Sequence, residues 1–436
     1  MNILTFPRFI NLALLVAAFF SFGQLGWAQS FDRIERERLK GILNIVKNEV
    51  KKNYYDPAYH GIDLDARFKK ADERLDQVTS TSQGLSVIAQ VLIDFDDSHL
   101  YLNPPATNLE VEYGWRMQAI GDRVYITQVK PKSAAEAKGL KIGDQVLAVS
   151  GFRPSRKELW KVLYYYGVLS KRDKLNLTVL SPGAETPRDL EIKAQVVKQP
   201  QNITFSTYFE FDDPFYVEEN YKHRMWTFGD VSIWKMPSFV LEPNDAESLL
   251  DSVKREGTLI LDLRGNGGGY VKTMEKVVGN VFAKDIKIAD LKGRKPKNPS
   301  IAKTRGKGAF TGKLIVLIDS RSGSAAEIFA RLVQLEGRGK VLGDVSAGAV
   351  MQARSYEGDV GSSTAVPFSI SVTDADVIMS DGKSLEHVGV TPDELILPTQ
   401  ADLAAGRDPV LARALELVGV KMSPEDDAKY HKFYWK

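Results

Sequence analysis

The sequence predicts a multidomain α/β protein with a helical N-terminal region, a β-rich middle region and a layered α/β core. Three observations support this prediction. Apolar residues recur at helical spacing near the N-terminus, short alternating segments begin at about residue 109, and buried-strand runs alternate with helical segments from about residue 225. Alternating strands and helices are typical of a layered α/β domain.

Composition limits the classes of protein to consider. The chain has 436 residues, which is long enough for two or three domains. Its hydrophobic content of 43% and charged content of 26% suit a globular protein with a proper core. The formal net charge of +2 argues against bulk binding of nucleic acid. Because the sequence contains no cysteine, disulfides, thiolate metal sites and thiol catalysis are excluded.

Residues 1–28 are predicted to be a signal peptide. Arg8 is the only charged residue in this segment, residues 9–22 are mostly apolar, and Gly26-Trp27-Ala28 offers small residues where a signal peptidase cuts. We therefore expect a mature chain that begins near Gln29 and is periplasmic or secreted. The apolar run is short for a membrane span, so a retained anchor is the less favoured alternative and no stable span is expected after cleavage.

Residues 29–108 are predicted to form a small helical domain. One face of a helix over 31–52 carries the apolar residues Ile34, Leu39, Ile42, Leu43 and Val46. Two more helices are expected at about 64–78 and 82–95. The pair Pro104-Pro105 closes the region, since proline ends regular structure.

Residues 109–198 are predicted to be β-rich. RVYITQV at 123–129 alternates as a strand does, and 174–180 and 188–194 follow the same pattern. Before those two strands, KPKSAAEAKGLKIGDQVLAVSG predicts a short helix, a glycine stop, a Gly-Asp turn, a strand and a Ser-Gly turn.

This order of turns resembles a PDZ domain, although Lys138 replaces the usual alanine before Gly139-Leu140. PDZ domains bind extended peptides, often free C-termini, by strand addition. The resemblance implies that the peptide-binding loop lies in EYGWRM (112–117) and contains Tyr113, Gly114 and Trp115. The alternative is a small β-barrel that serves only as a spacer.

Residues 199–400 are predicted to be the α/β core, and 401–436 a C-terminal helix and polar tail. The expected strands and helices alternate at 257–263, 270–283, 313–319, 324–335 and 340–344, with the C-terminal helix at 408–419. The basic segment 292–313 is interpreted as a solvated, mobile loop, because a nucleic-acid site would contain more interleaved aromatic residues.

A glycine cluster in LDLRGNGGG (261–269) follows directly after a predicted buried strand. Glycine lets backbone N–H groups approach a ligand without obstruction by a side chain. One interpretation is a phosphate cradle, although the segment lacks both the G-x-G-x-x-G spacing and a Gly-Lys-Ser/Thr. The other is an oxyanion hole, in which backbone donors stabilise developing negative charge.

Ser324 stands where the next buried strand turns into a helix, in DSRSGSAAEIFARL (319–332). Ser324 and Glu327 fit the capping-box pattern, so the serine can be a helix cap alone. A serine on a sharp strand-to-helix turn is also exposed beside N–H groups at a positive helix end. The two roles are compatible, but a serine nucleophile also needs a base.

DLRGNGGG and SGSAAEIFA, in this order and behind a PDZ-like segment, resemble the S41 peptidases, which include C-terminal processing proteases and tricorn-core proteases. EHVGVTPD (386–393) resembles the family too. The resemblance covers most of the chain after the signal peptide and implies a crotonase-like α/β core. It implies protein or peptide substrates, with C-termini among the candidate recognition elements, and no metal, nucleotide or other cofactor.

The base distinguishes two branches of that family. In the processing proteases a lysine follows the serine, and the corresponding position here is Ala349; Lys340 is nearby but matches no family position. The tricorn-like branch uses an N-terminal histidine preceded by serine, and DDSHLYL supplies Ser98-His99. That branch also places a glutamate late in the core, for which Glu386 is the candidate.

The resemblance therefore implies an exported serine endopeptidase that acts by acyl transfer through a covalent acyl-enzyme. Ser324 is the implied nucleophile and His99 the implied base, since an unperturbed histidine pKa near ~6.5 suits a base at neutral pH. Ser98 and Glu386 are implied to orient and polarise the histidine. The implied oxyanion donors are the backbone N–H groups of Gly268 or Gly269 and of Ala325.

Each of these residues alone has a structural interpretation. His99 can be a histidine at a helix end that Asp96 and Asp97 merely solvate, Glu386 a surface acid, and the glycines a tight turn. The rival to the peptidase is a non-catalytic peptide- or lipid-binding protein built on the same fold. The sequence predicts neither the oligomeric state nor the identity of the substrate.

Overall fold

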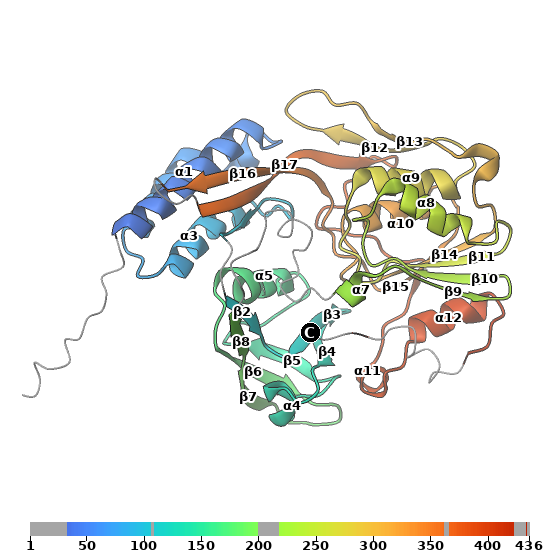
Figure 1. The fold of residues 1–436 in the computed structure, drawn as a ribbon, viewed down its shortest axis with the longest axis horizontal. Coiled ribbons are helices and arrows are strands. Elements are labelled where there is room, and N and C mark those ends of the chain that lie inside the picture. Colours follow the sequence, from blue (N-terminus) through green and yellow to red (C-terminus); the bar gives the residue numbers. More distant parts are fainter. Residues whose placement is uncertain (1–32, 106–108, 199–217, 362–365, 423–432, 434–436) are drawn as a thin grey trace, which may run out of the picture.

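The computed structural model describes residues 33–105, 109–198, 218–361, 366–422 and 433. Figure 1 shows three parts: N-terminal helices in blue, a β-rich domain in cyan and green, and a layered core in yellow to red. The predicted multidomain α/β organisation is confirmed. The predicted signal peptide lies outside the described residues, within which every helix is too short or too polar to span a bilayer.

The N-terminal part contains α1 (Arg33–Asn53), α2 (Leu64–Leu75) and α3 (Thr81–Ile93), with a short 3-10 turn at Tyr59–Gly61. The helices begin where side chains can cap them: Asp63 accepts from the Ala66 N–H before α2, and Ser80 accepts from the Gln83 N–H before α3. Apolar residues three and four apart bury one face of α1 from Leu39 onward, as the sequence predicts. The prediction is wrong for Ile34, which lies in the first turn and is 60% exposed.

These helices share their core with a long hairpin that the sequence analysis did not predict. Strands β16 (Met351–Val360) and β17 (Val366–Met379) reach from the core to α1 (Figure 1). Phe368, Ile370 and Val372 of β17 are buried among the helices. The short strand β1 (Tyr101–Asn103) then pairs antiparallel with β17, so the segment after α3 is fixed to the core.

The β-rich domain is a sheet with the strand order β3-β4-β5-β6-β7 and a separate β2-β8 pair. The strands are β2 (Leu109–Glu112), β3 (Trp115–Ile120), β4 (Arg123–Val129), β5 (Gln145–Val149), β6 (Lys174–Leu180), β7 (Arg188–Lys193) and β8 (Gln195–Lys198). The helices are α4 (Ala134–Ala137) and α5 (Leu159–Tyr164), the latter continued by a π-helical turn to Leu169. Inward residues of alternating strands form one buried cluster.

The core is built on a mostly parallel sheet with the order β18-β15-β14-β11-β10-β9. Its strands are β9 (Arg224–Phe228), β10 (Val231–Lys235), β11 (Thr258–Asp262), β14 (Lys313–Ile318), β15 (Lys340–Gly343) and β18 (Glu394–Leu395). Only the β9-β10 pair within this sheet is antiparallel. The associated helices are α7 (Glu218–Tyr221), α8 (Pro243–Asp251), α9 (Val271–Val281), α10 (Ala325–Leu335), α11 (Gln400–Ala405) and α12 (Pro409–Leu417).

Layers cover both faces of this sheet. Helix α12 packs on one face against Ile260, Leu317 and Leu342, while α8, α9 and α10 cover the other (Figure 1). A second sheet, which contains β12 (Ile286–Lys292), β13 (Ser300–Ala302) and β17, lies on the far side of those helices. Because side chains alternate along a strand, Leu259 and Leu261 of β11 face the first helix layer and Ile260 faces α12.

The interpretation of 292–313 as a loop is only partly correct, because the segment contains a short strand and a 3-10 turn. Ser300–Ala302 forms β13, which pairs antiparallel with β12, and a 3-10 turn follows at Gly306–Gly308. Some basic residues of the segment have acidic partners: Lys297 pairs with Asp374 at 2.7 Å and Lys303 with Asp285 at 2.7 Å. Basic composition therefore reflects local ion pairing, which the linear sequence does not reveal.

Candidate active site

The loops after β11 and β14 lie side by side, because these two parallel strands are neighbours that end at the same edge of the sheet. The Leu263 N–H donates to the Leu317 carbonyl at 2.9 Å just past the strand ends. The Gly323 N–H then donates to the Asn266 carbonyl at 2.9 Å. The glycine cluster and the segment that leads to Ser324 are therefore hydrogen-bonded to each other.

Gly268 lies against Ser324. A Cβ atom added at Gly268 would stand 2.7 Å from the Ser324 Cβ and 3.1 Å from the Ala325 backbone nitrogen. Gly268 also has a φ of 105°, a conformation that residues with a side chain rarely adopt. Glycine is required at this position both by its backbone conformation and by the close approach of the nucleophile turn.

The backbone N–H groups that could stabilise an oxyanion differ in whether they already donate a hydrogen bond within the protein. The Gly268 N–H donates to the Asn266 Oδ1 at 2.8 Å, so it is already used. Among the described residues, no acceptor is bonded to the N–H groups of Gly269 and Ala325. Ala325 is the first residue of α10, where the helix leaves its N–H groups without internal partners. Of the two glycine donors, Gly269 is the one available to a ligand.

Ser324 has an unusual backbone. Its φ of 52° lies in the left-handed region, and its ψ is −117°. The Ser324 N–H donates both to the Ala349 carbonyl at 2.9 Å and to the Glu327 Oε2 at 3.0 Å. The second bond is the glutamate half of the capping box that the sequence predicts. A cap and a sharp turn are thus combined at the same helix end.

Ser98, His99 and Glu386 are in direct contact. The Ser98 Oγ lies 2.7 Å from His99 Nδ1 and 2.9 Å from Glu386 Oε2. The Ser98 N–H also donates to Glu386 Oε1 at 2.8 Å. The structure therefore places the serine between the histidine and the glutamate, as a connected row of three polar groups.

The charge states of this row follow from its contacts. Burial lowers the pKa of His99, with the nearby Asp97 carboxylate opposing that shift, so the ring is neutral at neutral pH. Burial raises the pKa of Glu386, which its hydrogen bonds from Ser98 and Val350 oppose. An ionised Glu386 accepts the Ser98 hydroxyl proton; Ser98 Oγ then accepts from His99 Nδ1–H, which assigns the free lone pair to Nε2.

Additional residues hold the segment that carries His99, and the sequence analysis did not assign them a role. Asp97 is only 4% exposed and accepts from the His99 N–H at 2.9 Å and from the Thr373 Oγ1 at 2.7 Å. It does not merely solvate the helix end. His387 Nε2 lies 2.6 Å from the Asp96 carbonyl. The acidic run before Ser98-His99 is the sequence signal that could have identified Asp97.

The segment around Ala349 connects the two halves of the site. The Ala349 carbonyl accepts from the Ser324 N–H, and the next N–H, of Val350, donates to Glu386 Oε2 at 2.8 Å. In the described part of the structure, no hydrogen bond joins the Ser324 hydroxyl to the His99 ring. Lys340 is exposed at the start of β15.

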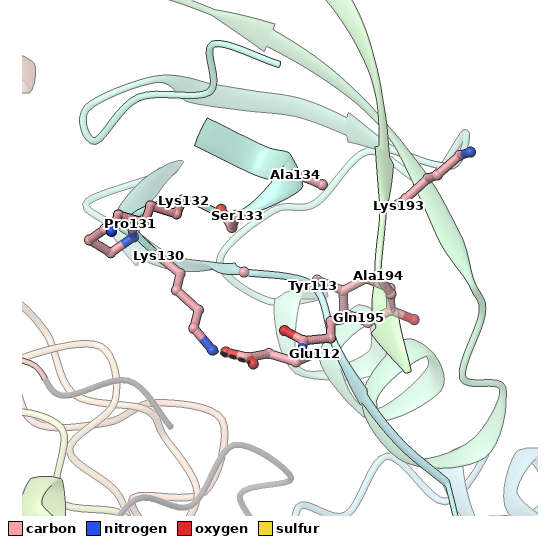
Figure 2. A pocket seen from close by; sticks show the side chains of 11 residues that line it. Glu112, Tyr113, Lys130, Pro131, Lys132, Ser133, Ala134, Lys193, Ala194 and Gln195 are labelled. Atoms are coloured by element: carbon pink, nitrogen blue, oxygen red, sulfur yellow. Dashed lines mark hydrogen bonds and ion pairs between the residues drawn. The ribbon is translucent and has the colours of Figure 1, made fainter. Parts of the chain in front are cut away.

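The residues predicted for the peptide-binding loop are mostly internal. Tyr113 is 5% and Trp115 6% exposed, and both pack in the core of the β-rich domain. Tyr113 and Gly114 also line a pocket of about 200 Å³, together with the Lys130–Pro131–Lys132 turn and the end of β7 (Figure 2). Figure 2 shows the Glu112–Lys130 ion pair, at 2.7 Å, along one wall of this pocket.

The β-rich domain also touches the loops of the candidate site. Gln118 of β3 donates to the Asp319 Oδ2 at 2.7 Å, and the Asp319 Oδ1 accepts from the Gly265 N–H at 2.9 Å. Arg156 donates to the Asp344 Oδ2 at 2.9 Å and pairs with the Val345 carbonyl. In the described residues, no group of three or more His, Asp or Glu side chains is arranged to hold a metal ion.

Two parts of the chain are similar to known protein families. Residues 230–396 match the peptidase family S41, and residues 110–157 match the PDZ domain. The chain is 28% identical over 238 residues to the carboxy-terminal processing protease CtpB of Bacillus subtilis, covering 53% of this chain and 45% of the relative. It is 30% identical over 167 residues to the putative tricorn protease homolog 2 of Streptomyces coelicolor, covering 36% of this chain and 13% of the relative.

The fold is similar to that of mature CPAF, with a TM-score of 0.62 and 14% sequence identity over 85% of this chain and 94% of that one. The chain spans less than half the length of the two curated relatives above. The fold and the sequence matches together define a multidomain α/β protein with a peptidase-like core. The core is therefore similar to the peptidases of family S41, and the middle region is similar to PDZ domains.

Proposed function

We propose that the chain is an exported serine endopeptidase that cleaves proteins or peptides by acyl transfer at a site formed by Ser324 and His99. The core is proposed to be crotonase-like, with the oxyanion donors after β11 and the nucleophile after β14. The observation that carries the proposal is the hydrogen-bonded row Ser98, His99 and Glu386, tied through Val350 and Ala349 to the Ser324 turn. A histidine whose Nε2 is free, and which is connected to a serine turn by hydrogen bonds, suits nucleophilic catalysis.

In the proposed reaction, Ser324 Oγ attacks the scissile carbonyl carbon while His99 Nε2 takes the hydroxyl proton. The N–H groups of Gly269 and Ala325 stabilise the tetrahedral oxyanion. The C–N bond then breaks, and His99 returns the proton to the leaving amine. Water, deprotonated by His99, hydrolyses the acyl-enzyme and restores the serine hydroxyl.

The direct test uses a fluorophosphonate probe, which modifies an activated serine covalently. We expect one label per chain in the parent protein, located on Ser324 by peptide mass analysis, and none in Ser324→Ala. A folded parent that takes no label at Ser324 under conditions that label a control serine peptidase would contradict the proposal.

The rival candidate is a non-catalytic peptide- or lipid-binding protein of the same fold. It is favoured by the missing hydrogen bond between the Ser324 hydroxyl and the His99 ring, and by Ala349 at the position of the processing-protease lysine. This candidate predicts an unlabelled Ser324 together with saturable binding of a peptide or lipid. Proposed catalysis instead requires Ser324 and His99 to come into hydrogen-bond contact when substrate binds.

Export and substrate capture are further parts of the proposal. Residues 1–28 carry the features of a cleaved signal peptide, so exported protein should begin near Gln29; an intact Met1 on membrane-bound protein would show a retained anchor. The domain at 109–198 is proposed to bind apolar peptide ends. Its removal should slow cleavage of long substrates more than of short peptides, whereas an equal loss would indicate a structural role.

A further inference from the structure

A buried carboxylate outside the predicted relay lies directly beneath the nucleophile turn. Glu327 is 0% exposed and belongs to the first turn of α10, three residues after Ser324. As a helix cap it would need only the bond from the Ser324 N–H. Its carboxylate accepts three other hydrogen bonds as well, all from segment 346–349, which follows β15.

The four bonds fall into two pairs. Oε2 accepts from the Ser324 N–H at 3.0 Å and from the Ala349 N–H at 2.9 Å. Oε1 accepts from the Gly348 N–H at 2.7 Å and from the Ser346 hydroxyl at 2.6 Å. A carboxylate offers about four lone-pair sites, so all of them are occupied by donors. A proton on this carboxylate must therefore break one of these bonds or reverse the direction of the bond to the Ser346 hydroxyl.

Segment 346–349 is important because it connects the Ser324 turn with Glu386. The Ala349 carbonyl accepts from the Ser324 N–H, and the Val350 N–H donates to Glu386. Ser324 itself has a φ of 52°, a strained conformation that persists only where the surroundings fix it. The Glu327 carboxylate contacts both the strained residue and the segment that fixes it.

We propose that Glu327 is a positioning residue for acylation, whose ionised carboxylate holds Ser324 and segment 346–349 in the reactive arrangement. The inference rests on the proposed function above. It assigns a second task to the residue that the sequence marks as a helix cap. In this chain, Ala349 then supplies backbone bonds to Glu327 and Ser324.

The ionisation of Glu327 supports this role. Burial raises the pKa of Glu327 to about 7, against the hydrogen bonds from Ser346, Ala349, Gly348 and Ser324, which lower it. The groups that contact the carboxylate carry no charge; the nearest titratable groups along the network are Glu386, bonded to Val350, and His99 beyond Ser98. Protonation below about pH 7 must therefore break one of these bonds or reverse the direction of the bond to the Ser346 hydroxyl.

The test is the rate of fluorophosphonate labelling of Ser324 as a function of pH in the full chain. In the parent, the rate should rise as pH increases through about 7, where Glu327 loses its proton, because His99, whose pKa is lowered, has already lost its own proton at lower pH. In Glu327→Gln, we expect labelling at least tenfold slower above that pH, and the rise should move to lower pH with a one-proton slope from His99 alone. Glu336→Gln, an exposed change at the other end of the same helix, should follow the parent.

A residue with a merely structural role would slow labelling at every pH without moving the rise, and that result would overturn the inference. If Glu327→Gln does not fold, Ser346→Ala removes one donor and frees a lone pair. Protonation of Glu327 then becomes easier, so the rise should move to higher pH; an unmoved rise would also overturn the inference. An unlabelled parent would instead remove the proposed function, and this inference with it.

Discussion

Two hydrogen bonds join Ser98 to Glu386, although 288 positions separate them in the chain. The Ser98 N–H donates to Oε1 at 2.8 Å and its hydroxyl to Oε2 at 2.9 Å. Because an ionised carboxylate only accepts, it fixes the hydroxyl proton and leaves the Ser98 Oγ free to accept from His99 Nδ1. We infer that Glu386 sets the tautomer of His99 through the intervening serine.

The first prediction concerns the nucleophile and the base. Ser324→Ala and His99→Ala should each lower kcat by several orders of magnitude, roughly 10⁴-fold or more, because the members of such a unit depend on one another. Lys340→Ala should change kcat by less than about twofold, since this side chain is exposed at a strand end. Steady-state kinetics on a protein substrate, with thermal unfolding as the folding control, measure these effects.

Two results would contradict that assignment in different ways. An active His99→Ala protein combined with an inactive Lys340→Ala protein would make a lysine the base. A Ser324→Ala protein as active as the parent would remove the peptidase site itself, and the binding-protein candidate would take its place.

The second prediction concerns the row Ser98, His99 and Glu386. Ser98→Ala removes the group between histidine and carboxylate, and Glu386→Gln places an amide donor among three donors. Each change should lower kcat by roughly 10²–10⁴-fold, the usual range for a lost acid–base contribution. Because the residues act in series, the double variant should be about as slow as the slower single variant. If the loss of kcat in the double variant equalled the product of the two single losses, the two residues would act independently.

The third prediction uses a matched pair of glycines. Gly268→Ala would bring a methyl group to 2.7 Å from the Ser324 Cβ and strain a φ of 105°, whereas a Cβ at the exposed Gly267 meets nothing within 4 Å. Gly268→Ala should therefore lower kcat/KM by roughly 10²-fold or more, comparable to the loss of an oxyanion donor. Gly267→Ala should remain near the parent value. Equal kinetics for the two variants would show that the close approach at Gly268 has no part in catalysis.

The sequence predicted three central strands and three helices of the core, because these strands are short, fully buried runs beside amphipathic helices. Strands β9, β10 and β12 and helix α8 were not predicted. Strands β11 and β14 and helices α9 and α10 lie within one or two residues of the predicted bounds. The hairpin β16-β17 was not predicted, because its pairing and its packing on α1 join residues that are distant in the chain. Its partner β1 has only three residues, too few for a periodic signal.

The candidate site was predictable only where side chains carry the signal. Ser98-His99 and Glu386 were named through family resemblance, and the structure brings these three residues into contact. The additional bonds of Glu327 were not predictable, because two of its three partners beyond the cap are backbone N–H groups. Every non-proline residue has such a group, so its use leaves no trace in the sequence. The same holds for the Ala349 carbonyl that accepts from Ser324.

The final prediction concerns the stability of the buried Glu327 carboxylate. Its pKa is about 7 in the folded protein and near the ordinary 4.5 when the chain unfolds. Between these values the folded state holds a proton that the unfolded state has lost, so the free energy of unfolding falls as pH rises from about 4.5 to about 7. The change is on the order of 3 kcal/mol from this one group.

Glu327→Gln cannot ionise and should lack this component. Thermal unfolding at about pH 5 and about pH 8 should therefore show a larger fall in Tm for the parent and for Glu336→Gln than for Glu327→Gln. Parallel pH dependences in all three proteins would mean that Glu327 does not titrate in this window, and the protonation step proposed for acylation would have to come from another group.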